Sequence, residues 1–127
     1  MPSVQACLPS EPVVERRDYI ERQIQQIAEA IARILGLSVQ NPAEAARAAD
    51  EALGRVTGFP LGMLLRLGAS GLLRTLGPER AIAAIPLLKA SAEAFRASGR
   101  GSEQAALLTL TKDLEGAARD RGLTIPD

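Results

Sequence analysis

Few residues in this sequence of 127 amino acids could take part directly in chemistry. The chain contains one cysteine, Cys7, and no histidine. A cysteine nucleophile needs a nearby base to activate it, and that base is usually histidine. The common zinc and transition-metal sites also depend on histidine and cysteine ligands. We therefore expect no catalytic residue, no metal site and no bound cofactor.

The carboxylates and glycines do not form a recognisable site either. Asp50 and Glu51 are adjacent, and adjacent residues on a helix point in different directions. Gly62, Gly68 and Gly71 do not have the spacing of a phosphate-binding loop. We interpret these glycines as positions that weaken a helix, and we predict that the protein is not an enzyme.

The composition favours an all-α fold. Hydrophobic residues make up 46% of the chain and aromatic residues only 2%. Alanine and leucine supply most of the apolar positions, and both are strong helix formers. Fifteen basic residues balance fifteen acidic ones, so there is no general attraction to nucleic acid, and we expect no nucleic-acid partner. Neither a secretory signal nor a long uncharged apolar stretch occurs, and we expect a cytoplasmic protein.

The most regular pattern is a row of isoleucines between residues 18 and 37. Its members follow one another at intervals of 4, 3, 4 and 3 residues and are Ile20, Ile24, Ile27, Ile31 and Ile34. Such an isoleucine row lies along one face of an α-helix and must be buried. Other helices of the same chain can bury it, or a second copy can do so in a homo-oligomer. We expect this helix to start near residues 10–13 and to end at Gly36, a natural C-terminal glycine.

A second helix should follow directly. Asn41 can cap it, Pro42 fits its first position, and Glu44 completes an arrangement like a capping box. We expect this helix to reach about Val56. The short link before it predicts an antiparallel hairpin with the first helix.

Two later segments leave alternatives open. Residues 61–76 should form either one loose helix or two short helices that meet near residues 68–70. Pro78 should start a fourth helix, which contains Pro86. A proline inside a helix removes one hydrogen bond, so Pro86 should either bend this helix or begin a second piece of it. We expect Pro86 to lie near Ile82, away from the apolar face.

The fifth helix should be capped by Ser102 and should end at Gly122. The predicted organisation is therefore a flexible N-terminal arm over residues 1–11 and a single helical domain over residues 12–123. A short tail follows over residues 124–127.

Two stretches resemble known families. Phe95 precedes a turn glycine, Gly99, by four residues, and Ala105 follows it in an alanine-rich helix. This arrangement is similar to a tetratricopeptide hairpin, although the usual tryptophan, the closing proline and the 34-residue period are missing. The opening Asp18-Tyr19-Ile20-x-Arg22-x-Ile24 resembles an uncharacterised bacterial family of small helical proteins, a domain of unknown function. These resemblances imply a tetratricopeptide-like stack or a compact bundle, with about five helices in antiparallel hairpins, and no activity.

Together these patterns predict a non-enzymatic module for protein–protein interaction, a scaffold or adaptor. The residues that we expect to contact a protein partner are Tyr19, Arg22, Arg66 and Arg74, since tyrosine and arginine are common interface anchors. The alternative is a peripheral membrane- or lipid-binding protein that uses the amphipathic segment 59–76, in which the two arginines lie opposite the leucines.

Overall fold

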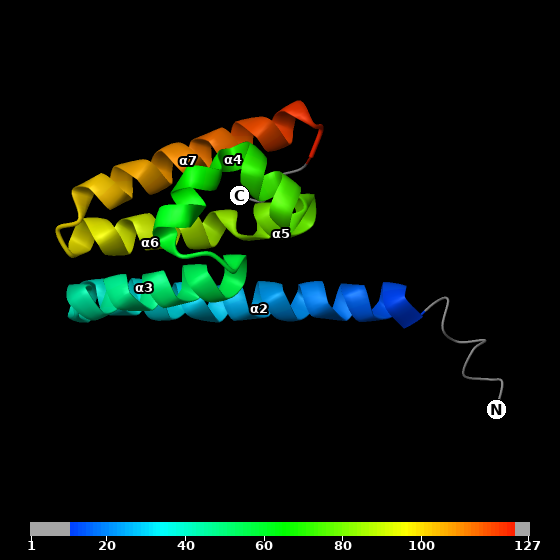
Figure 1. Ribbon diagram of the computed structural model, residues 1–127. Helices are drawn as coiled ribbons and strands as arrows, with labels where there is room; N and C mark the ends of the chain where they lie inside the picture. The colour runs from blue at the N-terminus through cyan, green and yellow to red at the C-terminus, as the bar shows by residue number, and fades with distance from the viewer. Residues whose placement is uncertain (1–10, 124–127) are drawn as a thin grey trace.

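The computed structural model describes residues 11–123, and these residues form an all-α bundle (Figure 1). The fold class predicted from composition is therefore confirmed. Residues 1–10 of the predicted arm, with Cys7 among them, and the predicted tail over residues 124–127 lie outside the described residues. Glu11, which was assigned to the arm, begins the first helix.

The helices form two antiparallel hairpins joined by a less regular middle segment (Figure 1). The first hairpin pairs α2 with α3, and the second pairs α6 with α7. About five helices were expected, and that number holds if α5 and α6 count as the one helix that was expected to start at Pro78. The elements are α2 (Glu11–Gln40), α3 (Pro42–Thr57), α4 (Leu61–Leu76), α5 (Pro78–Ala83), α6 (Ile85–Ala97) and α7 (Gly101–Asp120).

The central element is α6, not the isoleucine-rich α2. Eight of the 13 residues of α6 are buried, because it packs against α2 and α3 on one side and against α7 on the other. Phe95, the largest fully buried side chain, lies on this helix. The buried alanines of α3 have small side chains, and they therefore let the first hairpin lie close to α6. Among them are Ala45, Ala49 and Ala52.

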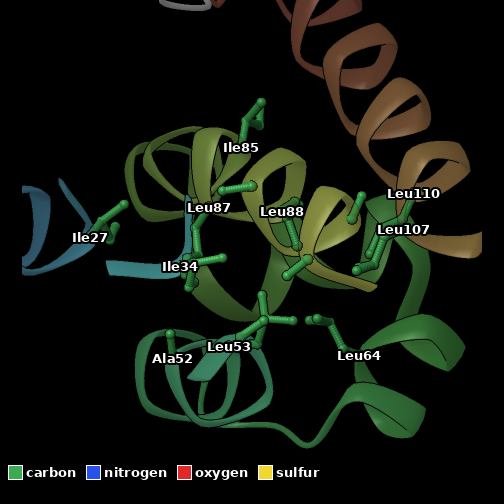
Figure 2. Packing of buried hydrophobic residues seen from close by; sticks show 14 of the residues in the cluster. Ile27, Ile34, Ala52, Leu53, Leu64, Ile85, Leu87, Leu88, Leu107 and Leu110 are labelled. Atoms are coloured by element: carbon green, nitrogen blue, oxygen red, sulfur yellow. The ribbon is translucent and has the colours of Figure 1, made fainter. Parts of the chain in front are cut away.

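Leucines from four helices fill the space around α6. Figure 2 shows Leu53 of α3 and Leu64 of α4 pointing toward one another, beneath Leu88 of α6. These three side chains and Leu107 of α7 are completely buried. Burial of a leucine side chain stabilises a fold by about 1.5–3 kcal/mol relative to exposure, so this cluster is a main source of stability.

Among the isoleucines of the row whose side chains the structure describes, burial increases toward the C-terminal end of α2. Ile27 and Ile34 are 4% and 1% exposed, whereas Ile24 is 50% exposed. The reason is a difference in helix length. At 1.5 Å per residue, the 30 residues of α2 span about 45 Å and the 16 residues of α3 about 24 Å. The N-terminal half of α2 therefore projects beyond its hairpin partner (Figure 1).

The first helix continues past Gly36, so the predicted end was wrong. The N–H of Asn41 still donates to the carbonyl of Leu37, at 2.6 Å. The helix ends at Gln40 because the residue before Pro42 is restricted to extended conformations, and Asn41 accordingly has φ −151°. Pro42, the first residue of α3, thus terminates α2.

The start of α3 is largely as predicted. Asn41 caps it, since its side-chain oxygen accepts the N–H of Glu44 at 3.3 Å. The reciprocal half of a capping box is missing, because the Asn41 N–H is already bound to Leu37 and the Glu44 carboxylate pairs with Arg47 at 3.4 Å. The helix ends at Thr57, one residue after the expected position.

Two segments were left with alternatives, residues 61–76 and the helix that contains Pro86. In the structure, each of them consists of two helical pieces. Gly68 has φ +68° inside α4, which divides this helix within the range expected for a junction. Ala84 separates α5 from α6, and Pro86 lies at the second position of α6, where its missing N–H costs nothing. The backbone therefore breaks at Ala84 and does not bend at Pro86.

The cap predicted for the last helix was wrong. The Arg100 N–H donates to the carbonyl of Phe95 at 2.7 Å, which closes α6, and the Arg100 carbonyl then accepts the first bond of α7 from Gln104 at 3.1 Å. Ser102 consequently lies inside the first turn, and its hydroxyl donates to Glu103 at 3.3 Å. Gly122 follows the end of α7, as predicted.

Candidate functional site

An apolar groove lies between the N-terminal half of α2 and the segment where α5 meets α6. Its volume is about 630 Å³. Of the ten described residues that line it, nine are apolar, and Glu79 is the only charged one. The lining residues are Ile24, Ile27, Ala28, Ile31, Pro78, Glu79, Ile82, Ala83, Pro86 and Leu123.

Two local features of the sequence produce this groove. The isoleucine row supplies one wall, because it continues along α2 past the part that α3 covers. Pro78 and Pro86 delimit a helix of only six residues, α5, which leaves Ile82 and Pro86 facing α2. Pro86 was expected near Ile82 and away from the apolar face, and it is half-buried and lines the groove beside Ile82.

 Ala84 lies at the break between α5 and α6. Its φ of −79° is helical, although α5 ends at the residue before it.

The residues of α2 that line the groove differ in how far they are exposed to solvent. Ile27 is almost completely buried, whereas Ile24 is half exposed and Ala28 is exposed. Each additional 100 Å² of apolar surface removed from water is worth about 2.5 kcal/mol. A ligand that covers this side of α2 therefore gains free energy mainly from apolar contact. The single carboxylate, Glu79, can select for a basic group at the rim.

The four residues predicted to contact a partner do not come together. Tyr19 is 49% exposed on α2, and the Arg80 guanidinium lies 5.9 Å from the centre of its ring. Arg22 is exposed on the same helix. Arg66 and Arg74 are exposed on α4, on the two sides of the break at Gly68, and α4 packs against α3, α5 and α7. None of the four lines the groove.

A cluster of ion pairs lies where α6 turns into α7, at the end of the bundle away from α5 (Figure 1). Arg100 pairs with Glu103 at 2.7 Å and with Asp50 of α3 at 3.3 Å, and its guanidinium lies 4.4 Å from the centre of the Phe95 ring. The hydrogen bond from Arg100 lowers the pKa of Glu103, and the same bond raises the pKa of Arg100. These contacts tie α3 to the second hairpin and are structural.

Within residues 11–123, no three acidic or cysteine side chains gather closely enough to hold a metal ion. In the same range, no single helix is both long and apolar enough to cross a membrane. The bent pair of α3 and α4, with 48° between them, meets that criterion by length and composition alone.

Comparison with known proteins gives no match. No family model, no curated protein and no solved structure matches this sequence. The resemblances to tetratricopeptide hairpins and to a bacterial family of unknown function therefore stay predictions.

The sequence analysis missed the groove, although part of its signal was present. Ile82 and Pro86 are four residues apart, which places two apolar side chains on one side of a helix, opposite the face that was expected to be buried. Such a second apolar side indicates that something else covers it. The contribution of Leu123 could not be inferred, because it depends on where α7 ends in space.

Proposed function

We propose that this chain is a non-enzymatic protein-binding module whose groove takes one apolar face of a helix from a protein partner. The observation that carries the proposal is the groove itself, with nine apolar residues and one charged residue around about 630 Å³. Amphipathic helices bind in hydrophobic grooves of this kind through apolar residues at positions i, i+3, i+4 and i+7.

The shape and chemistry of the groove support a helical occupant. Two of its walls are helices, so a third helix can lie alongside them and interdigitate its side chains with theirs. The half-exposed Ile24 offers the kind of apolar contact that dominates helix packing. The resemblance to tetratricopeptide hairpins agrees with this proposal, because stacked helical hairpins present such surfaces to peptides and helices.

The lipid-binding alternative has less support. It requires the leucines of segment 59–76 to be available to a membrane surface, and Leu64, Leu72 and Leu73 are buried inside the bundle. Co-sedimentation of the full chain with anionic vesicles, abolished by Arg66→Glu together with Arg74→Glu, is the result that would favour this alternative.

The proposal can be tested with displayed helical peptides. A phage library of amphipathic helices is selected against the full chain, immobilised at low density. The recovered peptides are then measured against Ile24→Glu and against Leu108→Glu. These two residues are 50% and 46% exposed on different helices, so the second variant controls for adding a charge at a comparable position.

We expect the recovered peptides to share the helical apolar spacing and to bind the wild-type chain and Leu108→Glu alike. Their affinity for Ile24→Glu should fall at least about tenfold, because the new carboxylate must lose water inside an apolar groove. Recovery of no such peptide, or equal binding to Ile24→Glu, would reject the groove as a protein-binding site.

A further inference from the structure

We propose that the helix bound in this groove lies along α2 for at least three turns and carries a basic residue beside Glu79. The inference rests on the proposed function, since it names the length, the apolar spacing and the charge of the partner helix that the same groove takes.

The groove continues along α2 as an outer apolar strip. The members of this strip follow one another at intervals of 4, 3 and 4 residues and are Ile24, Ala28, Ile31 and Leu35. Ile24 and Leu35 are 50% and 44% exposed, Ala28 is exposed, and Ile31 is half-buried. The first three line the groove, and Leu35 extends the strip by one turn beyond them.

The outer strip lies beside the face of α2 that the bundle covers. Ile27 and Ile34 are almost completely buried on that inner face, seven residues apart. Two helices whose apolar residues alternate between intervals of 4 and 3 residues pack nearly along each other, at about 20°. The spacing of the outer strip therefore fits a helix that lies along α2, with the same alternation in its own apolar residues.

The outer strip also sets the length of the occupant. Leu35 follows Ile24 by eleven residues, which corresponds to about 17 Å at 1.5 Å per residue. A helix that covers both ends of the strip needs at least three turns. Its own apolar residues then stand at positions i, i+4, i+7 and i+11.

Glu79 gives one end of the groove a negative charge. It lies toward the Tyr19 end of α2, because the guanidinium of the next residue, Arg80, is 5.9 Å from the centre of the Tyr19 ring. Glu79 is exposed, and none of the ion pairs between described side chains includes it. Its carboxylate is therefore available to a basic group of the partner helix.

The charges that continue the other wall of the groove are already paired. Lys89 and Glu93 follow Pro86 by three and seven residues, a spacing that keeps them on one side of α6. Lys89 pairs with Glu115 at 3.0 Å, and Glu93 pairs with Arg96. Opposite charges across an interface favour the right partner and its register, so the basic residue of the partner belongs at the Glu79 end of its apolar face.

The test uses the helical peptides recovered from the library, with the residues that flank their apolar face randomised. Fluorescence anisotropy measures their binding to the full chain at low and at high salt. Leu35→Glu tests the length of the contact, and Leu108→Glu is its control, because the two leucines are 44% and 46% exposed on different helices. Glu79→Lys tests the charge, and Glu51→Lys is its control, because Glu51 is exposed on α3 and does not line the groove. Circular dichroism confirms that each variant keeps its helices.

We expect the recovered peptides to carry a lysine or arginine at one end of their apolar face. Leu35→Glu should weaken their binding at least about tenfold. Glu79→Lys should weaken it at least about threefold at low salt and less at high salt. Both controls should bind like the wild type, and exchange of the basic residue of the peptide for glutamate should restore binding to Glu79→Lys.

Peptides that Ile24→Glu rejects, but that bind Leu35→Glu or Glu79→Lys as they bind the wild type, overturn this inference and leave the proposed function standing. If no helical peptide is recovered, or if Ile24→Glu binds as well as the wild type, both fail. Self-association of the wild-type chain in sedimentation equilibrium that Leu35→Glu abolishes would show that a second copy takes the outer strip, and this result also overturns the inference.

Discussion

Arg80 of α5 donates a hydrogen bond from Nη2 to the carbonyl oxygen of Val56, 3.2 Å away in the last turn of α3. The last carbonyls of a helix have no partner within it, and a basic side chain near them is favourable. The same guanidinium lies over the Tyr19 ring. Arg80 therefore joins the first hairpin to α5, close to the groove, and helps to fix the distance between the groove walls.

The first prediction concerns this contact. Arg80→Ala should lower the free energy of unfolding by about 1–2 kcal/mol, because it leaves the Val56 carbonyl without its donor in a partly buried position. Denaturant unfolding of the full chain measures the change. Arg66→Ala removes an exposed arginine from α4 and should stay within about 0.5 kcal/mol of the wild type. Equal effects of the two substitutions would show that the Arg80 contact adds nothing.

A second prediction tests the corrected end of α2. Gly36 is helical, and a Cβ added to it would meet no atom within 4 Å. Gly36→Ala should therefore raise the free energy of unfolding by up to about 1 kcal/mol, since alanine is the better helix former. A left-handed glycine at the helix end would give the opposite sign. Thermal unfolding of the wild type and this variant decides between the two positions of the helix end.

Features that depend on neighbouring residues could be predicted from the sequence. Asn41 and Pro42 mark the start of α3, and Gly122 marks the end of α7, because capping and turn preferences act within a few residues. The same locality explains the error at Gly36. A glycine there is compatible with either a helix end or a helix interior, and the end of α2 is set by Pro42, six residues later.

Features that depend on distant segments could not be predicted. The row of isoleucines marks α2 as amphipathic, yet how far it is buried depends on the shorter length of α3. The central position of α6 likewise follows from its packing against three other helices, α2, α3 and α7. The groove combines both effects, since it exists only where α2 passes beyond α3 and where α5 and α6 separate.

The break in α4 gives a third prediction, with opposite signs at two glycines of one helix. Gly68 has φ +68°, which an L side chain rarely adopts. Gly68→Ala should therefore lower the free energy of unfolding by about 1 kcal/mol or more. Gly62 is helical and has open space around it, so Gly62→Ala should raise the free energy of unfolding by about 0.4–1 kcal/mol. Urea unfolding of both variants is the measurement, and the same sign at both positions would contradict a break at Gly68.

The last prediction concerns the acid side of stability. In the folded chain, Arg100 donates to Glu103 from Nε at 2.8 Å, and this hydrogen bond lowers the pKa of the carboxyl below its ordinary value of 4.5. A lowered folded-state pKa means that the unfolded chain takes up the proton first as the pH falls. The stabilisation is therefore complete above about pH 4.5 and is lost as the pH falls through the folded-state pKa.

Glu103→Gln should reduce the difference in unfolding free energy between about pH 6 and about pH 3, because the variant has no proton to bind at this position. Arg100→Gln removes the donor and should reduce the same difference, although it also removes the contact with Asp50. Urea midpoints of the three chains at both pH values give the comparison. If Glu103→Gln keeps the full acid dependence of the wild type, the hydrogen bond from Arg100 to Glu103 does not persist in solution.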